Sequence, residues 1–139
     1  MTNHTLRIPA ELSQLATVRR FVEATGASLG LPRALTDPLI LAVDESLSNI
    51  IQHGYQHRAG TITIEVEHTA AAFSVRLHDQ APPFDPTAMP DPDVTQPLHQ
   101  RPVGGLGVYF ARRSVDSIVY ERTPAGENRL TLMKNIPPA

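Results

Sequence analysis

The stretch Thr61-Ile62-Thr63-Ile64-Glu65-Val66-Glu67 decides the fold, because its apolar residues occupy every second position. Side chains of an extended chain point alternately to opposite faces, so this pattern predicts a strand with one buried face. Phe73-Ser74-Val75-Arg76-Leu77-His78-Asp79 alternates in the same way. The link between the two stretches, His68 to Ala72, is short enough for an antiparallel hairpin.

Two helical patterns come before this hairpin. Apolar residues recur every three or four positions from Glu11 to about Leu29, and again from about Pro32 to His53. Pro38 lies inside the second pattern and could mark a break, because the ring disfavours helix just before it. Gly54 is expected to end the second helix in the left-handed conformation. A short strand, His4 to Ile8, precedes both helices.

The chain after the hairpin divides into a long loop and three further elements. Residues 80–102 have no periodicity and hold seven of the thirteen prolines, and loops of this length are more often functional than accidental. Gly104 to about Val115 is predicted as a short helix. Strands are expected at 117–122 and 129–133, joined by a turn at Pro124–Gly126.

This order of elements, β-α-α-β-β-loop-α-β-β, predicts an α+β fold. Hairpin-type connections favour a mixed, mainly antiparallel sheet with the helices on one face, which is a two-layer α/β sandwich. The sequence has no Gly-x-Gly-x-x-Gly after a first strand and no Gly-Lys-Ser/Thr. A Rossmann or P-loop fold is therefore disfavoured.

Composition indicates one globular domain spanning residues 1–139. Hydrophobic residues make up 41% and charged residues 19% of the chain, which is ordinary for a soluble protein. A net charge of −2 without a basic cluster argues against direct nucleic-acid binding. Cysteine is absent, which excludes disulfides and thiolate chemistry. Since neither a signal peptide nor a membrane-length apolar run is found, we expect no membrane contact and a cytoplasmic location.

Glu45 and Asn49 are four positions apart in the second helix, so their side chains leave the same face. A carboxylate that can accept a proton then lies beside an amide oxygen that can ligate Mg²⁺. The alternative is an exposed polar stripe, with Asp44 and Ser48 as further candidates for the solvated positions. His53, one turn later, is interpreted as a helix cap rather than a zinc ligand.

Asp79 and a glycine cluster are the other candidates for chemistry. Asp79 ends a strand and is either a turn-initiating residue or a carboxylate that accepts a hydrogen bond from a nucleobase amino group. Gly104-Gly105-Leu106-Gly107 opens a helix, where backbone N–H groups can surround a phosphate. Arg101 could reach a terminal phosphate or be an ordinary solvated residue. Together these features suggest a protein that handles a nucleoside triphosphate.

Taken in order, these motifs resemble those of the GHKL ATPase superfamily, and within it the small anti-sigma-factor serine kinases of bacteria. Leu41 to Tyr55 looks like the N-box of that group, with Glu45 and Asn49 in place. Asp79-Gln80-Ala81-Pro82-Pro83-Phe84-Asp85-Pro86 looks like its first glycine box, and Gly104 to Tyr109 like its second. The likeness covers nearly the whole chain.

The resemblance implies a Bergerat-type sandwich that binds ATP and Mg²⁺ under a lid formed by about residues 80–103. It implies that Glu45 is the general base, that Asn49 is the Mg²⁺ ligand and that Asp79 contacts adenine. The residues that it places around the nucleotide are Asn49, Asp79, Ala81, Phe84, Arg101, Gly104, Gly105, Leu106 and Gly107.

The same resemblance implies an activity and partners. Members of the group phosphorylate a serine of a STAS-type anti-anti-sigma protein, and many also bind a sigma factor, commonly as homodimers. Two positions depart from the pattern, since Ala81 and Pro83 stand where glycines are usual. These changes motivate an alternative function, a non-catalytic module that binds a sigma factor or a phosphatase in a nucleotide-dependent manner.

Overall fold

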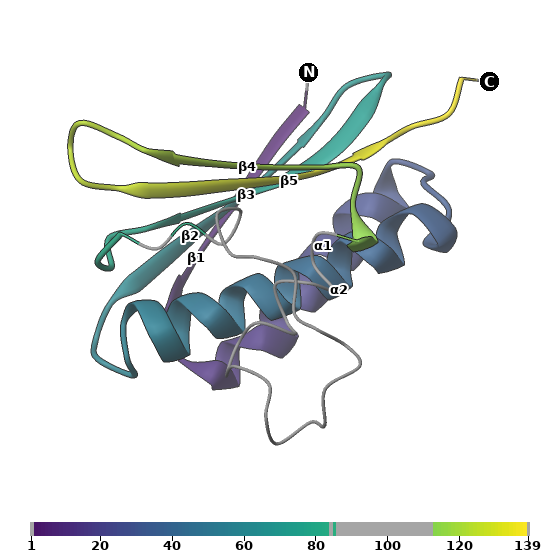
Figure 1. Cartoon of the computed structure of the whole chain (residues 1–139). Helices are drawn as coiled ribbons and strands as arrows, with labels where there is room; N and C mark the ends of the chain where they lie inside the picture. Colours follow the sequence, from purple (N-terminus) through teal and green to yellow (C-terminus); the bar gives the residue numbers. More distant parts are fainter. Residues whose placement is uncertain (1, 84, 86–112, 139) are drawn as a thin grey trace, which may run out of the picture.

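Five strands and two long helices make up the part of the chain described by the computed structural model, which comprises residues 2–83, 85 and 113–138 (Figure 1). The strands are β1 (Thr2–Pro9), β2 (Thr61–His68), β3 (Ala72–Asp79), β4 (Ser117–Arg122) and β5 (Asn128–Asn135). The helices are η1 (Leu12–Gln14, 3₁₀), α1 (Leu15–Ser28), α2 (Arg33–Asn49) and η2 (Ile50–Gly54, π).

The strands form one sheet in the order β1-β2-β3-β5-β4. Each of the four pairings that this order contains is antiparallel. Both α1 and α2 lie on the same side of the sheet, as Figure 1 shows. The predicted two-layer α+β architecture is therefore confirmed, with the described pairings fully antiparallel rather than mixed.

Alternation in β2 and β3 produces the core. Ile62, Ile64 and Val66 of β2 are fully buried against the helices, and so are Phe73, Val75 and Leu77 of β3. Burial of each such side chain stabilises the fold by about 1.5–3 kcal/mol. The helices contribute Val22 of α1 and a row of α2 residues to the same core: Leu39, Val43 and Leu47.

Pro38 does not interrupt α2, which runs unbroken from Arg33 to Asn49. Proline has no N–H and so cannot donate to the carbonyl one turn earlier, which weakens an isolated helix. Here the apolar residues that follow Pro38 are packed against the sheet, with Leu39 and Leu47 at 0% exposure. Tertiary burial therefore outweighs the local cost of the proline.

The left-handed conformation predicted for Gly54 is wrong. The helix continues through Gly54 as a π-type turn, in which the Tyr55 amide donates to the Ile50 carbonyl at 2.8 Å. The left-handed residues come later, at Gln56 (φ 55°) and His57 (φ 60°). Their side chains are polar and exposed, and the turn they form leads the chain toward β2.

The remaining elements agree with prediction to within a few residues. The first strand extends to Thr2–Pro9 and the last to Asn128–Asn135, with Gly126 (φ 87°) in the turn before it. Residues 113 and 114 are helical, but the rest of the helix predicted from Gly104 lies outside the described residues. Among the described helices, none combines the length and the hydropathy needed to cross a membrane.

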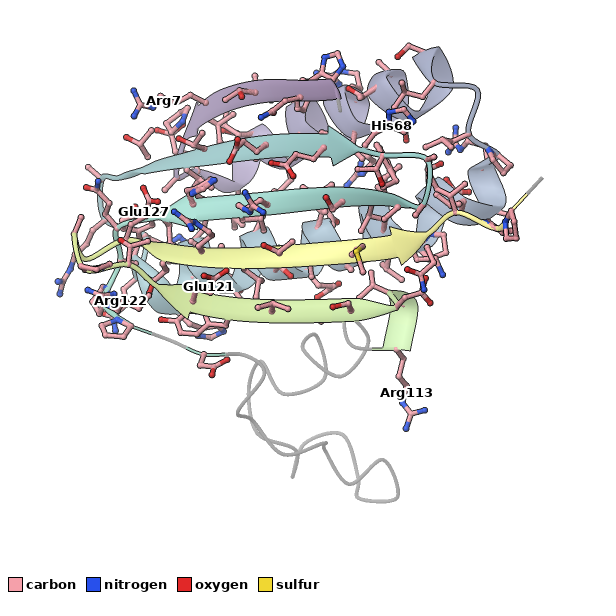
Figure 2. All side chains as sticks on the ribbon, turned by 90° about the horizontal axis from the view of Figure 1, so that it is seen from above. Arg7, His68, Arg113, Glu121, Arg122 and Glu127 are labelled. Carbon is pink, nitrogen blue, oxygen red and sulfur yellow. The ribbon has the colours of Figure 1, made fainter. Side chains whose placement is uncertain are left out.

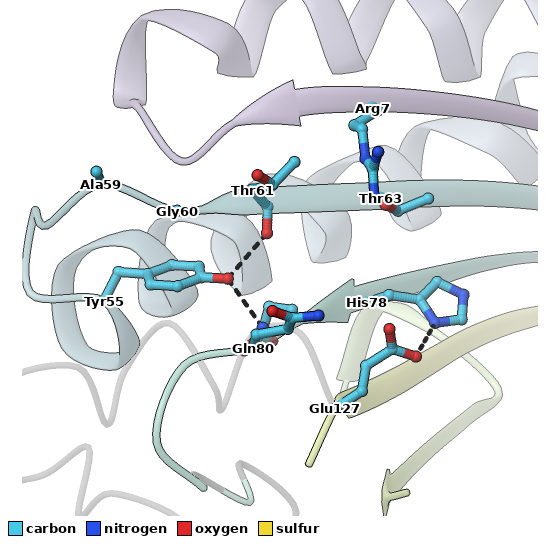
Figure 3. Close-up of a pocket in the computed structure, with 10 residues that line it drawn as sticks. Arg7, Tyr55, Ala59, Gly60, Thr61, Thr63, His78, Gln80 and Glu127 are labelled. Carbon is cyan, nitrogen blue, oxygen red and sulfur yellow. Dashed lines mark hydrogen bonds and ion pairs between the residues drawn. The ribbon is translucent and has the colours of Figure 1, made fainter. Parts of the chain in front are cut away.

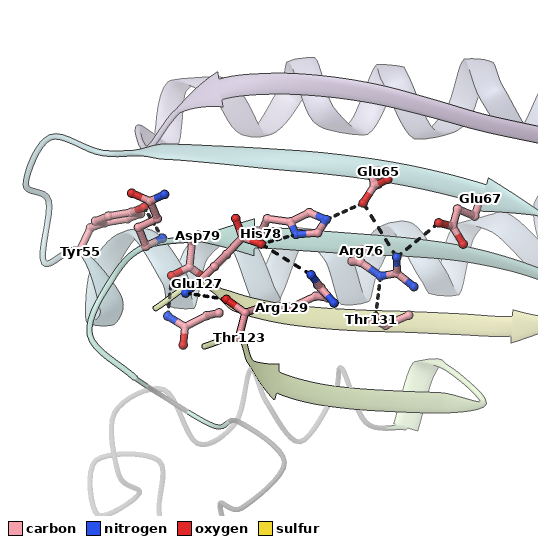
Figure 4. A network of polar contacts seen from close by, with 12 residues as sticks. Tyr55, Glu65, Glu67, Arg76, His78, Asp79, Thr123, Glu127, Arg129 and Thr131 are labelled. Atoms are coloured by element: carbon pink, nitrogen blue, oxygen red, sulfur yellow. Dashed lines mark hydrogen bonds and ion pairs between the residues drawn. The ribbon is translucent and has the colours of Figure 1, made fainter. Parts of the chain in front are cut away.

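The face of the sheet that the helices leave open carries charged side chains (Figure 2). Arg76 lies 3.3 Å from Glu67 and 3.2 Å from the Thr131 hydroxyl (Figure 4). His78 bridges two carboxylates, contacting Glu65 through Nε2 and Glu127 through Nδ1. Burial would raise the pKa of the Glu65 carboxyl, but hydrogen bonds from His78 and Asn3 bring that pKa below its ordinary value.

Candidate nucleotide site

Asp79 is the last residue of β3, and its side chain lies on the helix side of the sheet at 5% exposure. Its Oδ1 accepts two hydrogen bonds, from the Ala81 amide at 2.9 Å and from Asn128 Nδ2 at 2.8 Å. The bond to the amide two residues later is an Asx turn. The two expectations for Asp79 are therefore compatible, since the residue initiates a turn and also presents a buried carboxylate.

Burial raises the pKa of the Asp79 carboxyl above its ordinary value. Hydrogen bonds from Asn128 and Ala81 and the charge of Arg122 oppose this shift, but they do not cancel it. A carboxylate with a raised pKa in a buried position is a common mark of a functional site. Burial deprives the Asp79 carboxylate of water as a hydrogen-bond partner. A hydrogen bond donated by a ligand would therefore stabilise it.

Ala81 is 3% exposed and packs against the end of the π-type turn. A Cβ built on Gly54 would lie 3.2 Å from the Cβ of Ala81, a tighter contact than carbon atoms normally make. The methyl group at position 81, where the family pattern has glycine, is thus accommodated because residue 54 has no side chain. Glycine is needed at position 54 because of this close approach to Ala81, and not because of its backbone angles.

Glu45 is half-buried and Asn49 is 9% exposed, one helical turn apart on α2. Neither side chain makes a hydrogen bond or ion pair with another residue in the described ranges. The neighbouring Asp44 does, because its carboxylate lies 3.1 Å from Arg19 of α1. The structure thus distinguishes the two adjacent carboxylates, because Asp44 joins the two helices and Glu45 has no such partner in the described ranges.

Tyr55 connects the site to the start of β2 (Figure 3). Its hydroxyl donates to the Thr61 carbonyl and accepts from the Gln80 amide, both at 2.8 Å. Burial raises the pKa of the Tyr55 hydroxyl above its ordinary value. A Cβ on Gly60 would lie 2.4 Å from the Tyr55 ring, so glycine is required there for close approach. Tyr55 therefore fixes the position at which the chain leaves β3.

A polar hollow of about 320 Å³ lies beside Tyr55 on the open face of the sheet (Figure 3). Its lining includes Arg7, Thr63, His78 and Glu127. Asp79 and Gln80, at the end of β3, also line it, whereas Glu45 and Asn49 do not.

Sequence reasoning missed Asn128, which is 5% exposed and hydrogen-bonded to Asp79. In the sequence it follows a Gly126 turn and has the appearance of an ordinary turn residue. The signal that identifies it is the strand register, which pairs Asp79 with Asn128, and that register is a tertiary property. Six predicted site residues lie outside the described ranges: Phe84, Arg101, Gly104, Gly105, Leu106 and Gly107.

Comparison with known proteins adds independent findings. A family model described as the histidine kinase-like ATPase domain matches residues 8–134. The chain is 25% identical over 117 residues to the serine-protein kinase RsbW of Bacillus cereus (strain G9842), covering 81% of this chain and 73% of that protein. RsbW of Bacillus mycoides (strain KBAB4) is 24% identical over the same length.

A solved structure has the same fold. It contains the RsbU and RsbW domains of a Mycobacterium tuberculosis protein and superimposes with a TM-score of 0.69 at 17% sequence identity. The match covers 100% of this chain and 34% of the solved one, so the chain corresponds to about a third of the chain in that structure.

Proposed function

Because the chain belongs to the histidine kinase-like ATPase domain family, we propose that it binds ATP and phosphorylates a serine of a partner protein. The relatives described as serine-protein kinases support this choice of reaction. The observation that carries it is the pair Glu45 and Asn49, which share one face of α2 and have no partner among the described residues. Buried polar groups nearly always have a hydrogen-bond partner, and a bound nucleotide with its metal ion would supply one here.

Each residue of the site then has a distinct role. Asp79 accepts a hydrogen bond from the amino group of adenine, and Ala81 packs beside it. Asn49 fits a divalent cation, because its amide oxygen is a hard ligand and its buried side chain has no partner in the described ranges. Mg²⁺ bound there would neutralise charge on the phosphates.

The residues outside the described ranges are assigned from motif resemblance alone. We propose that Gly104, Gly105, Leu106 and Gly107 hold the phosphates through their backbone, with Arg101 at the terminal phosphate. Phe84 would lie against the nucleotide, and residues 80–103 would form the lid.

Glu45 acts as the general base. Its carboxylate takes the proton of the substrate serine as the serine Oγ forms a bond to the γ-phosphorus. The bond from that phosphorus to the bridging oxygen breaks, and ADP leaves with the electron pair. The products are phosphoserine, ADP and a proton held on Glu45, which is then released to solvent.

The proposed substrate is a STAS-type anti-anti-sigma protein, and a sigma factor is a second partner of a homodimeric kinase. Phosphorylation would add about −1.5 to −2 charges to the surface of the substrate and so weaken or create a protein contact. We place the reaction in the cytoplasm, where ATP is available.

The experiment is phosphate transfer from labelled ATP, with Mg²⁺, to a cognate STAS-type protein. We expect wild type to form phosphoserine and Glu45→Ala to lose at least about a hundredfold in rate, as expected for removal of a general base. Asp44→Ala is the matched control, because it removes the adjacent carboxylate, which faces Arg19 instead. Equal rates for wild type and Glu45→Ala would contradict the proposal.

A further inference from the structure

Asp79, Asn128 and Arg122 form a row across three neighbouring strands. The register pairs Asp79 of β3 with Asn128 of β5, and Asn128 with Arg122 of β4. Directly paired residues point to the same face of a sheet. Asp79 and Asn128 thus meet on the helix side, each at 5% exposure, although 49 positions separate them in the sequence.

The Asn128 amide uses all of its hydrogen-bonding capacity. Nδ2 donates to Asp79 Oδ1 at 2.8 Å and to the Ala81 carbonyl at 2.9 Å. Oδ1 accepts from the Tyr120 hydroxyl at 2.6 Å and from Arg122 at 2.9 Å. An amide offers two donors and two acceptor sites, so all four are used. Turning the amide over would place its oxygen against two acceptors, and its orientation is therefore fixed.

The Asp79 carboxylate has two unequal oxygens as a result. Both of its hydrogen bonds, from Asn128 and from the Ala81 amide, end on Oδ1. Rotation about Cβ–Cγ would move Oδ1 away from both donors and leave a buried Asn128 N–H unpaired. Oδ2 therefore keeps a fixed direction, and no residue in the described ranges donates a hydrogen bond to it.

We propose that Asn128 is a positioning residue for nucleotide recognition. By holding Oδ1 it directs Asp79 Oδ2 at the 6-amino group of adenine, and it anchors the Ala81 carbonyl at the root of the segment that follows β3. This inference rests on the proposed function, because it requires adenine at Asp79. The β4–β5 hairpin holds Asn128 in turn, because Tyr120 and Arg122 both donate to its Oδ1. We call Asn128, Tyr120 and Arg122 the clamp.

The clamp acts on one part of the ligand. A site built to accept a hydrogen bond rejects an analogue that lacks the donor, because the buried acceptor is then left unpaired. Asn128 should therefore contribute to discrimination between ATP and purine riboside triphosphate, which has hydrogen in place of the 6-amino group. Phosphate binding should be insensitive to Asn128.

The experiment measures the Kd of both nucleotides for wild type, Asn128→Ala, Asp79→Asn and the double variant. We expect Asn128→Ala to weaken ATP binding about tenfold, the effect of one charge-assisted hydrogen bond, and to change the analogue by less than about twofold. The double variant should bind ATP no more weakly than Asp79→Asn, since both changes act through one carboxylate. Equal losses for the two nucleotides, or additive losses, would overturn the inference.

Asn128→Asp serves as an isosteric second variant if truncation prevents folding. It replaces the amide donor with an oxygen that repels Asp79 Oδ1, and we expect the same selective loss of ATP affinity. Asn135→Ala is the matched control, because Asn135 is exposed at the other end of β5. It should leave both Kd values unchanged.

A measurement without nucleotide separates this inference from the proposed function. The Ala81 N–H donates to the same Oδ1, so its hydrogen exchange should become at least about tenfold faster in Asn128→Asp. Unchanged exchange would overturn the clamp. Failure of the wild type to bind ATP, with fast Ala81 exchange in the variant, would instead contradict the proposed function and leave Asn128 with a structural role.

Discussion

At the scale of single residues, Asp79 shows how a functional group can oppose stability. Its burial raises the pKa of the carboxyl, so the protonated form is the one that the fold favours. A carboxyl whose pKa is raised by folding makes its full favourable contribution to the free energy of unfolding at pH values below its pKa in the unfolded chain. That contribution is lost as pH rises through the folded pKa, and at neutral pH the ionised Asp79 costs stability.

We therefore expect Asp79→Asn to increase the free energy of unfolding at pH 7 by about 1 kcal/mol while ATP binding is weakened. Asparagine keeps an oxygen for the Ala81 and Asn128 donors but carries no charge to desolvate. Urea unfolding at pH 7 and pH 4 measures the difference, which should shrink at the lower pH. A variant less stable than wild type at pH 7 would contradict this account.

Single residues also mark the limit of what the sequence predicts. Helical spacing placed Glu45 and Asn49 on one face, because that relation is local. That Asp44 has an ion-pair partner could not be predicted, because Arg19 lies on another helix. Asn128 was not predictable, because its partner Asp79 is reached only through the pairing of β3 with β5.

At the scale of elements, the end of η2 contacts the turn after β3 through two small residues, Gly54 and Ala81. Gly54 and Ala81 leave room for one methyl group between them. We expect Gly54→Ala to reduce the free energy of unfolding by about 1–3 kcal/mol, because a second methyl overfills this contact.

The test is a double-mutant cycle with Ala81→Gly, followed by chemical denaturation. Removing the opposing methyl should relieve the overlap, so the double variant should be more stable than the two single changes predict by at least about 0.5 kcal/mol. Additive effects would show that the two residues do not compete for the same space.

Element types were predictable where the pattern is local, and element ends were less so. Alternation identified β2 and β3 because each buries one face completely. The passage of α2 through Pro38 and the π-type turn at Ile50–Gly54 depend on packing against the sheet, which no local pattern encodes. The left-handed residues Gln56 and His57 are polar, and a search limited to glycines misses them.

At the scale of the whole molecule, the sheet has a buried face toward the helices and an ionised face toward solvent. The second face contains Glu65, whose carboxyl has a lowered pKa because of His78 and Asn3. The contribution of such a group is present above the pKa of the unfolded chain and is lost as pH falls through the folded pKa. Glu65 should therefore make the fold sensitive to acid.

We expect Glu65→Gln to reduce the free energy of unfolding by about 1 kcal/mol at pH 7, and the difference from wild type to vanish by about pH 3. Thermal or urea unfolding across that range measures it. Glu121→Gln is the matched control, since it removes the same charge from an exposed position on β4. A constant difference at all pH values would contradict the role assigned to His78.

The fold class was predictable from the sequence as a whole, because hairpin links and two amphipathic helices permit few arrangements. The antiparallel pairing of β5 with β3, and the position of β4 at the edge, came from the structure. These two pairings bring Asn128, Tyr120 and Arg122 to the site.

The strand order also has a consequence for folding. β2 and β3 are joined by a short hairpin link, whereas Pro9 pairs with Thr61 and Asp79 with Asn128 across long stretches of chain. Closing a longer loop costs more chain entropy and slows the contact that depends on it. The hydrogen bond between Asp79 and Asn128 is therefore expected to form after the β2–β3 hairpin, and nucleotide affinity that depends on it should appear only after the central strands have paired.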